Sequence, residues 1–283
     1  MRIVVTGATG AVGRRLVTAL RARGDEVTVL ARNPDRATEL LGVPAVVWDP
    51  VTVPPPADAL AGADGVVHLA GEPVAQRWND QVKRRIHESR EIGTRHLVTA
   101  LAALPDGDRP SVLVSASASG YYGPCGDEIV TEQTPPGSDF LAIVCVHWEQ
   151  EAAAAAQHGV RACLLRTGIV LDPRGGALAK LVPVFRLGAG GPVAGGRQYM
   201  PWIHADDLTS LYLRALDDAG WSGPVNASAP EPVTNAEFSR TLGRALHRPA
   251  VVPVPALALR RALDARFAFA HPALEPALAD LLG

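Results

Sequence analysis

The chain has 283 residues, of which 47% are hydrophobic and 20% charged, and its formal net charge is −2. This composition can form a large buried core, which argues against a disordered chain, and the small net charge predicts no nucleic-acid partner. Three distant cysteines argue against disulfides and zinc, so we expect no metal site and a cytoplasmic location. We also expect no membrane partner, because no signal-peptide pattern and no bilayer-spanning apolar run is present.

Apolar runs and helical spacing alternate along the first part of the chain. Strands are predicted at 2–6, 26–31, 45–48, 65–69, 111–116 and 160–167. Helices are predicted at 12–23, 79–104 and 141–158. This alternation predicts an α/β fold of the Rossmann-like kind, a doubly wound parallel sheet with helices on both faces.

The pattern changes after about residue 172, where glycines and prolines become dense. Shorter helices are expected near 206–218, 235–246 and 255–263. We therefore predict a nucleotide-binding domain over 1–172. Residues 173–283 are expected to form a smaller substrate-binding lobe, interleaved with the first domain and placed at the edge of the sheet where ligands bind.

The most informative motif directly follows the first predicted strand. Gly7 permits a tight turn, Gly10 lets the backbone approach a pyrophosphate, and Gly13 lets the next helix pack on the strand. Backbone N–H groups and the helix dipole then favour a bound phosphate. The expected cofactor-binding residues of this segment are Gly7, Thr9, Gly10, Ala11, Val12 and Gly13.

The end of the second strand distinguishes between the two nicotinamide dinucleotides. A site that prefers NAD has an acidic residue there, whereas this chain has Arg32, with Arg36 nearby. Because a guanidinium pairs well with a 2′-phosphate, we expect NADP(H), although Arg32 could also be a plain surface arginine. Asp49 closes the third strand and could accept a hydrogen bond from the adenine amino group, or only form a turn before Pro50.

The fourth strand ends in a segment that we expect to line the cofactor with its backbone. It consists of Leu69, Ala70 and Gly71. His68, which comes before it, is interpreted as a residue packed at the strand end rather than a catalytic one.

These segments, together with the Ser115–Ala118 strand end, resemble the extended short-chain dehydrogenase/reductase superfamily. A closer resemblance is to its atypical "epimerase family" subgroup, which is related to the human family 39U member. The matching stretches are spread over nearly the whole chain: 71–73, 88–90 with 93–95, 115–123, 140–141 with 144–145 and 148–149, 166–168, 175–178, 202–204 with 206–208, and 223–226 with 233–235. The resemblance implies a Rossmann-like fold and NADP(H) binding. We further expect Glu72 to contact the substrate, and Thr167, Gly168 and Ile169 to contact the cofactor.

The chain departs from the superfamily in two respects. Working members use a Tyr-x-x-x-Lys pair on the helix after the fifth strand, where the lysine lowers the pKa of the tyrosine. In this chain the two positions of the pair are occupied by Val144 and Trp148, or by Cys145 and Glu149. The C-terminus is also shorter than expected around 259–267, which predicts a remodelled substrate lobe.

Four residues could replace the missing pair. Ser117 could donate to a carbonyl oxygen or only to the strand end, and Tyr121 could supply a phenol, although the sequence shows no cation beside it. Cys145 could be an acid or a ligand contact, or a buried structural cysteine. Glu149 lies one helical turn further on the same face and could act as a base, or be a salt-bridged surface residue.

A second set of residues is expected to contact the substrate. Tyr122, Tyr199, Trp202 and His204 combine aromatic and polar groups that suit a small-molecule pocket. Trp202 could equally belong to the core of the lobe, and Asp207 is first a helix-cap candidate.

The sequence leaves three functions open. The first is an NADP(H)-dependent oxidoreductase or epimerase that acts on a small molecule by hydride transfer. The second is a non-redox enzyme on the same scaffold, such as a dehydratase, isomerase or cyclase, and the third is an NADPH-binding sensor without catalysis. The long helices after the fourth and fifth strands could form a homodimer, and fold alone does not decide among these functions.

Overall fold

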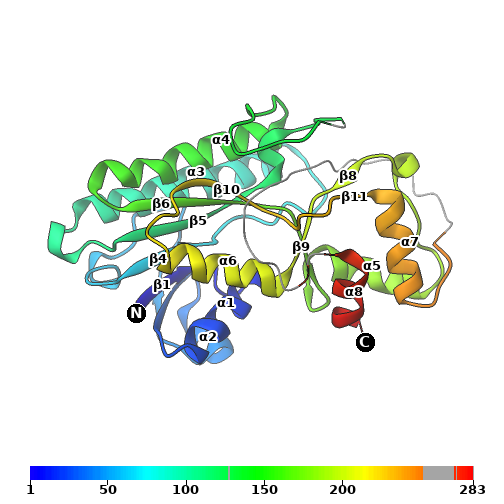
Figure 1. Cartoon of the computed structure of the whole chain (residues 1–283). Coiled ribbons are helices and arrows are strands. Elements are labelled where there is room, and N and C mark those ends of the chain that lie inside the picture. The colour runs from blue at the N-terminus through cyan, green and yellow to red at the C-terminus, as the bar shows by residue number, and fades with distance from the viewer. Residues whose placement is uncertain (127, 251–270, 272, 283) are drawn as a thin grey trace. The chain divides into compact units, whose positions relative to one another are not determined.

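The structure is a computed structural model, and it describes residues 1–126, 128–250, 271 and 273–282. Two compact units alternate along the chain (Figure 1). Unit 1 comprises Met1–Ser117, Ile143–Leu165 and Thr209–Pro224, and unit 2 comprises Ala118–Ala142, Arg166–Leu208 and Val225–Gly283. Whether the functional domains divide at residue 172 stays a prediction.

The main sheet has the strand order of a Rossmann fold. Its seven strands run β10-β6-β5-β4-β1-β2-β3, and the pairs β1–β2, β1–β4, β2–β3 and β4–β5 are parallel. The order reverses between β1 and β4, the switch point where such sheets bind ligands. The strands are β1 Arg2–Thr6, β2 Glu26–Ala31, β3 Ala45–Val47, β4 Gly65–His68, β5 Val112–Ala118, β6 Arg161–Thr167 and β10 Gly223–Ala227.

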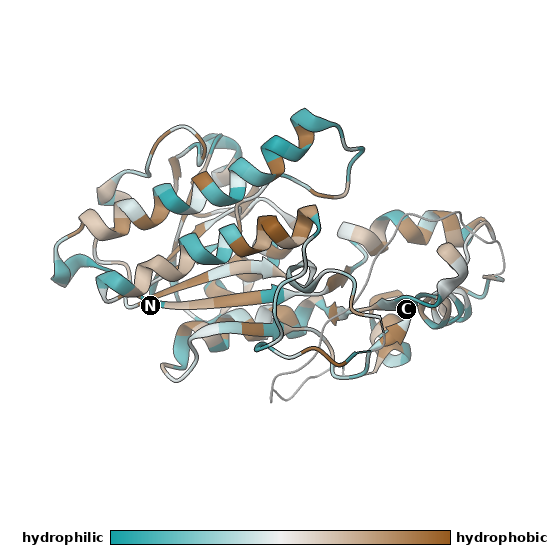
Figure 2. Cartoon of the chain, turned by 90° about the horizontal axis from the view of Figure 1, so that it is seen from above, coloured by the Kyte–Doolittle hydropathy of each residue, from teal (hydrophilic) through white to brown (hydrophobic). Residues whose placement is uncertain are grey.

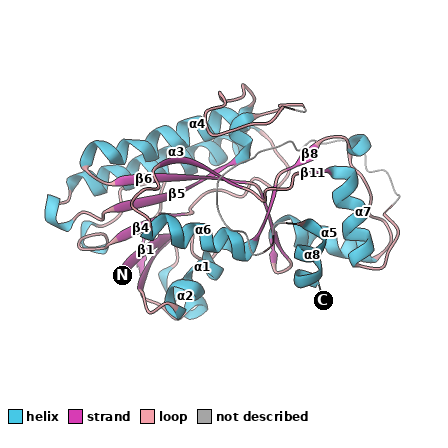
Figure 3. Ribbon diagram, viewed as in Figure 1, coloured by secondary structure: helices cyan, strands magenta, loops and turns pink. Residues whose placement is uncertain are grey.

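Helices cover both faces of this sheet. In Figure 3, α3 and α4 lie on one face and α1 and α2 on the other. Figure 2 shows brown and teal alternating along these helices, as expected where one side of a helix packs on the sheet. The bounds are α1 Ala11–Ala22, α2 Pro34–Leu41, α3 Asp80–Ala103 and α4 Phe140–Ala153, with a 3₁₀ turn at Ala154–His158 after α4.

Helix α2 was not predicted from the sequence, although its ends carry clear signals. The Asn33 side chain accepts a hydrogen bond from the Arg36 N–H, Pro34 is the first helical residue, and Gly42 ends the helix with a φ of 63°. The helix is eight residues long and buries only Ala37, so its apolar periodicity is too weak to predict it.

Unit 2 has its own small sheets and apolar core. Strands β7 and β9 pair in parallel, and β8 and β11 pair antiparallel. Its core includes Trp202, Phe238 and Leu278. The bounds are β7 Ile169–Asp172, α5 Gly176–Arg186, β8 Tyr199–Met200, β9 Trp202–His204, α6 Ala205–Asp217 (which continues into unit 1), β11 Val233–Thr234, α7 Asn235–Ala245 and α8 Leu274–Leu282. The helix predicted at 255–263 and the shortened stretch at 259–267 lie outside the described residues.

None of the helices in the described part of the chain has the length and apolarity that a membrane crossing requires.

A buried histidine joins the sheet to α3 inside unit 1. His68 is fully buried, with its Nδ1 atom 2.7 Å from Thr6 Oγ1 and its Nε2 atom 3.1 Å from Thr94 Oγ1. Burial and the charge of Arg90 lower its pKa from 6.5 to about 3. His68 is therefore neutral in the folded protein and packs at the end of its strand, as the sequence indicated.

The lowered pKa of His68 predicts that the folded protein loses stability in acid. Its pKa is depressed by folding, so below pH 6.5 the unfolded chain takes up a proton that the folded chain does not, and stability falls progressively as the pH falls towards 3. Between pH 7 and pH 5 the free energy of unfolding should drop by about 2 kcal/mol through this residue alone. Urea unfolding of wild type and His68→Asn at both pH values measures it.

His68→Asn should be less stable than wild type at pH 7. Between pH 7 and pH 5, however, its free energy of unfolding should fall by about 2 kcal/mol less than that of wild type. His158→Asn, at a surface 3₁₀ turn, is the matched control and should keep the wild-type pH dependence. Parallel pH curves for wild type and His68→Asn would contradict the assignment.

Candidate functional site

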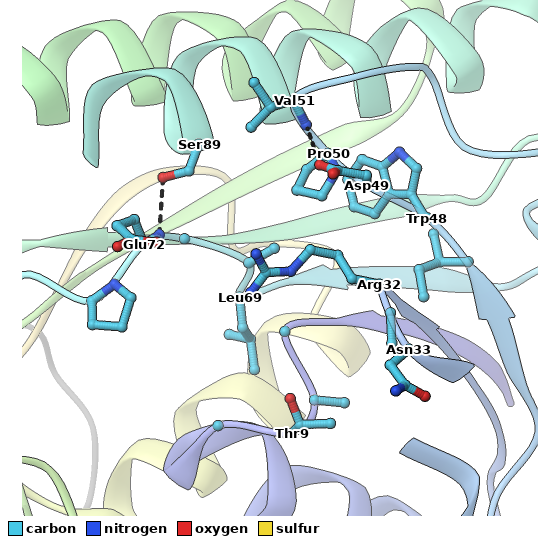
Figure 4. Close-up of a pocket in the computed structure, with 18 of the residues that line it drawn as sticks. Thr9, Arg32, Asn33, Trp48, Asp49, Pro50, Val51, Leu69, Glu72 and Ser89 are labelled. Atoms are coloured by element: carbon cyan, nitrogen blue, oxygen red, sulfur yellow. Dashed lines mark hydrogen bonds between the residues drawn. The ribbon is translucent and has the colours of Figure 1, made fainter. Parts of the chain in front are cut away.

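A cavity of about 800 Å³ opens in unit 1 beside the ends of β1, β2 and β4 (Figure 4). The structure brings most of the predicted cofactor residues together there. The sequence-predicted residues that line it are Gly7, Thr9, Gly10, Arg32, Asp49, Leu69, Ala70, Gly71 and Glu72. Glu72, predicted as a substrate contact, thus shares this cavity with the cofactor candidates. Ala11, Val12 and Gly13 form the first turn of α1, and Thr167, Gly168 and Ile169 belong to unit 2.

The turn after β1 has the geometry of a phosphate loop. Gly7 has a φ of 67°, and its carbonyl accepts a hydrogen bond of 3.1 Å from the Gly10 N–H. A Cβ atom at Gly7 would lie 2.5 Å from the Leu69 carbonyl carbon, so only glycine fits. No side chain caps the start of α1 and no acidic residue lies in its first turn. The positive end of this helix can therefore attract an anion.

Gly13 brings α1 close to the same turn. A Cβ atom at this position would lie 2.5 Å from Ala8 Cα and 2.7 Å from the Gly7 carbonyl oxygen. Helix and turn can therefore pack at this distance only without a side chain, which keeps the helix N-terminus beside the cavity.

The segment after β4 is held from two sides. Thr6 Oγ1 accepts hydrogen bonds of 3.2 Å from both the Leu69 and the Ala70 N–H. From α3, Ser89 Oγ accepts from the Glu72 N–H at 2.9 Å, and Arg90 Nη1 donates to the Glu72 carbonyl at 3.0 Å. Ser89 and Arg90 lie in one of the stretches that carry the family resemblance, but no role was predicted for them.

Arginines surround the part of the cavity next to β2. Arg14, Arg32 and Arg36 all line it, and Arg14 Nε donates to the Thr9 carbonyl at 2.8 Å. Figure 4 shows the Arg32 side chain extending into the cavity from the end of β2. These cations suit a ligand that carries several phosphate groups.

Asp49 follows the neighbouring strand β3 and takes part in the turn that the sequence allowed. Its Oδ1 atom accepts a hydrogen bond of 3.1 Å from the Val51 N–H. Trp48 is buried beside it, and its indole N–H donates to the Val53 carbonyl at 2.8 Å. Asp49 therefore combines a turn role with a position on the cavity wall.

A buried polar pair joins the end of β5 to α4. Ser117 Oγ donates a short hydrogen bond of 2.6 Å to Glu149 Oε1, and the two residues are only 4% and 8% exposed. Such a short bond indicates a strong interaction with a carboxylate. Glu149 is therefore a buried residue rather than a surface residue.

The positions of the superfamily pair carry no tyrosine or lysine, and large side chains fill this region. Val144, Cys145 and Trp148 are buried, and the Arg90 guanidinium lies 5.0 Å above the Trp148 ring. Burial lowers the pKa of Arg90 from its ordinary value. The described structure gives Cys145 the buried surroundings that the sequence allowed, and a catalytic contact for it stays a prediction.

In unit 2, a cation does lie beside the two tyrosines, which corrects the sequence analysis. The Arg166 guanidinium lies 3.5 Å from the centre of the Tyr121 ring and donates to the Tyr122 hydroxyl at 2.9 Å. The sequence could not reveal this because 44 residues separate Arg166 from Tyr122. Tyr122 in turn donates to Asn226 Oδ1 at 2.6 Å, and burial outweighs the arginine and raises the pKa of Tyr122.

The other substrate candidates also lie in unit 2. Trp202 is fully buried, and its indole N–H donates to the Glu231 carbonyl at 3.1 Å. Trp202 therefore belongs to the core of unit 2, one of the two roles that the sequence allowed. His204 is buried too, and its ring stacks on His271 with centres 3.8 Å apart. Tyr199 is half-buried in β8. Their contacts with a substrate stay predictions.

One smaller expectation is wrong. Asp207 is not a helix cap, because α6 begins at Ala205 and Asp207 lies within its first turn. Its Oδ2 atom accepts a hydrogen bond of 3.1 Å from the His271 N–H.

The comparisons with known proteins identify the family. The model of the NAD dependent epimerase/dehydratase family matches residues 3–227. The chain belongs to this family. The epimerase family protein SDR39U1 of Homo sapiens is 37% identical over 259 residues, which cover 90% of this chain and 84% of the human protein. The Arabidopsis thaliana SDR39U1 homolog, which is described as chloroplastic, is 41% identical over 266 residues, covering 93% of this chain and 76% of that protein.

A solved structure of an epimerase-family protein extends the agreement to the fold. Human SDR39U1 (isoform 2), crystallised with NADPH, matches with a TM-score of 0.87 and 32% sequence identity, covering 100% of this chain and 99% of that one. The predicted resemblance and the Rossmann-like α/β fold are thereby confirmed. This epimerase-family chain differs from superfamily members that use the Tyr-x-x-x-Lys pair, because its α4 contains no tyrosine and no lysine.

The close packing at Gly13, in the first turn of α1, leads to a prediction about stability. Gly13→Ala should lower the free energy of unfolding by about 1–3 kcal/mol, because the added methyl group has to displace loop backbone rather than a flexible side chain. Chemical denaturation at neutral pH measures the difference.

Gly107→Ala is the matched control, since a Cβ atom there has nothing within 4 Å. Its free energy of unfolding should stay within about 0.5 kcal/mol of the wild type. Equal stabilities of the two variants would show that α1 can move away from the turn at no cost.

Proposed function

We propose that this chain binds NADP(H) in the unit 1 cavity and uses it for hydride transfer to or from a small molecule. The glycine turn supports the cofactor assignment, because backbone at Gly7 and Gly10 can approach a pyrophosphate without a Cβ atom in the way. The uncapped start of α1 adds a favourable field for the same phosphates. The human relative whose structure contains NADPH supports the same choice.

Arginines on the cavity wall favour the phosphorylated dinucleotide over NAD(H). Arg32 at the end of β2 would pair with the 2′-phosphate, and Arg36 would add a second positive charge. Asp49, just after the neighbouring strand β3, would accept a hydrogen bond from the adenine amino group. The backbone at Leu69, Ala70 and Gly71 would line the rest of the cofactor.

The buried Ser117–Glu149 contact is the observation that carries the reaction proposal. The cofactor supplies a hydride acceptor or donor, and the protein has to move one proton at the same carbon–oxygen group. In the oxidation direction, Ser117 Oγ receives the proton of the substrate hydroxyl and passes its own proton to Glu149 Oε1, 2.6 Å away. The reverse path protonates the alkoxide that forms when a carbonyl is reduced.

This pair would replace the tyrosine and lysine of the superfamily. A carboxylate within hydrogen-bond reach can take a proton from a serine hydroxyl, whereas an isolated serine has no base. Tyr121 and Cys145 are kept as further catalytic candidates. In unit 2, substrate contacts are proposed for Tyr122, Tyr199, Trp202 and His204, and cofactor contacts for Thr167, Gly168 and Ile169. A cytoplasmic homodimer stays part of the proposal.

The filled region around α4 favours a second candidate, in which the nucleotide is bound but no hydride moves. Cys145 and Trp148 are buried and Arg90 covers the Trp148 ring, so bulky groups lie near the positions of the usual pair. A non-redox enzyme would form product with no change in nicotinamide absorbance. A sensor would bind NADPH and turn over nothing.

The first test is a fluorescence titration of the protein with NADPH and, separately, with NADH. Wild type should prefer NADPH, and Arg32→Ala should weaken NADPH binding by about 10-fold or more while changing NADH binding by less than about 3-fold, because the lost guanidinium pairs only with the 2′-phosphate.

Arg84→Ala is the control, because Arg84 is exposed on α3 and does not line the cavity. It should bind both dinucleotides as the wild type does. Equal losses of NADPH and NADH affinity in Arg32→Ala would remove Arg32 from the 2′-phosphate role, and no binding of either dinucleotide would overturn the cofactor proposal.

The second test follows NADPH oxidation with a panel of aldehydes and ketones. For any carbonyl that is reduced, Glu149→Gln and Ser117→Ala should lower kcat by about 100-fold or more, because proton transfer to the alkoxide is lost. NADPH affinity should change by less than about 3-fold, since neither residue lines the cofactor cavity.

Glu151→Gln, on the outer side of α4 and paired with Arg95, is the matched control and should keep wild-type kcat. An undiminished kcat in Glu149→Gln would exclude the proposed proton path. Tight NADPH binding without oxidation by any carbonyl would favour the non-redox or sensor function.

A further inference from the structure

Two helices of unit 1 bring together a group of side chains that the proposed reaction does not use. His87 and Glu91 lie one turn apart on α3, and His147 faces them from α4. Their side chains are 32%, 24% and 40% exposed, so the group is open to solvent on one side. The sequence separates His147 from His87 by 60 residues, and helix pairing alone brings them together.

Three donor atoms of this group form a small triangle. His87 Nε2 lies 2.8 Å from His147 Nδ1 and 3.0 Å from Glu91 Oε2, and His147 Nδ1 lies 3.6 Å from Glu91 Oε2. Ligand atoms around a zinc ion at about 2.1 Å lie roughly 3 to 3.5 Å apart. An ion about 2.1 Å from all three atoms would lie roughly 1 Å out of their plane.

Arg95 holds the Glu91 carboxylate from outside this triangle. Arg95 Nη2 donates to Glu91 Oε1 at 2.7 Å and to Glu151 Oε1 at 2.6 Å. Arg95 thus orients Glu91 through one oxygen and leaves Oε2 on the side of the histidines, as outer residues do in metal sites.

We propose that His87 Nε2, Glu91 Oε2 and His147 Nδ1 bind one divalent first-row transition metal ion, with zinc as the type case. Two imidazole nitrogens and one carboxylate form the donor set of such ions, whereas Mg²⁺ and Ca²⁺ require oxygen ligands. Water or an external ligand would complete the coordination. This proposal departs from the expectation drawn from the cysteines, because histidine and glutamate supply all the ligands.

The ion would join α3 to α4 near the proposed proton path. His147 lies two residues before Glu149 on α4, and His87 lies near Ser89 and Arg90, which hold the Glu72 segment. Bound metal would therefore restrict the movement of both helices on which the site depends. The geometry of the three ligand atoms supports this metal site whether or not the protein transfers a hydride.

A second group of possible ligands serves as an internal comparison. His204, Asp206, His271 and Asp280 lie in unit 2 with their donor atoms within 4.8 Å of one another. The two histidine rings are stacked with an angle of 27° between their planes, so they would have to turn apart before both could bind one ion. We therefore expect the group on α3 and α4 to bind metal more tightly.

The test is a titration of tag-free, chelator-treated protein with Co²⁺, followed by visible absorption, and with Zn²⁺ in competition with a chromophoric chelator. Wild type should bind one equivalent at the tight site and develop the visible band of cobalt with nitrogen ligands. His147→Gln and Glu91→Gln should weaken the affinity by about 10-fold or more, because each removes one of three protein ligands. Zn²⁺ should also raise the melting temperature of wild type but not of His147→Gln.

Two controls separate this site from others. His158→Gln, at a histidine outside both groups, and Asp280→Asn, in the unit 2 group, should bind as tightly as wild type. His147 is 40% exposed, so His147→Gln should melt within a few degrees of metal-free wild type, which confirms that it folds. The proposal is overturned if wild type binds no metal, if His147→Gln binds as tightly as wild type, or if Asp280→Asn loses the tight site.

Discussion

The close approach of two backbone segments at the switch point of the sheet is the constraint on which the site depends. The turn after β1 and the segment after β4 meet so closely that a single Cβ atom at Gly7 would lie 2.5 Å from the Leu69 carbonyl carbon. Thr6 stabilises this contact, because its hydroxyl accepts from two N–H groups of the β4 segment. The cavity lies beside this contact, where the strands diverge, and these two segments contribute mainly backbone to its wall.

Helix α3 connects this constraint to the rest of unit 1. Through Thr94 it reaches the buried His68, and through Ser89 and Arg90 it fixes the Glu72 segment. Its outer side carries Glu91 and Arg95, which connect to α4 through His147 and Glu151. A change on this helix can therefore affect the cavity wall, the buried strand end and the helix that carries Glu149.

The polar groups of unit 1 divide into two kinds with different chemistry. The cavity near β2 has exposed arginines and a helix N-terminus, which suit binding of phosphate groups and contribute little to proton transfer. The Ser117–Glu149 pair is buried and has one short hydrogen bond, which suits proton transfer more than binding. This division is consistent with a cofactor held by one region while a second region handles the proton, and it makes the two functions separable by mutation.

The sequence by itself determined the features that depend on local order. The period of apolar residues predicted β1, β2 and the long helices, and the spacing of Gly7, Gly10 and Gly13 predicted the phosphate loop, because these follow from a few consecutive residues. Short elements such as α2 and β7 were missed, since eight and four residues are too few to show a period. Only the tertiary structure decided which distant side chains meet: Ser117 with Glu149, Arg166 with Tyr122, and His87 with His147. These contacts depend on how strands and helices pair across 32 to 60 residues of chain, and no local pattern in the sequence records that pairing.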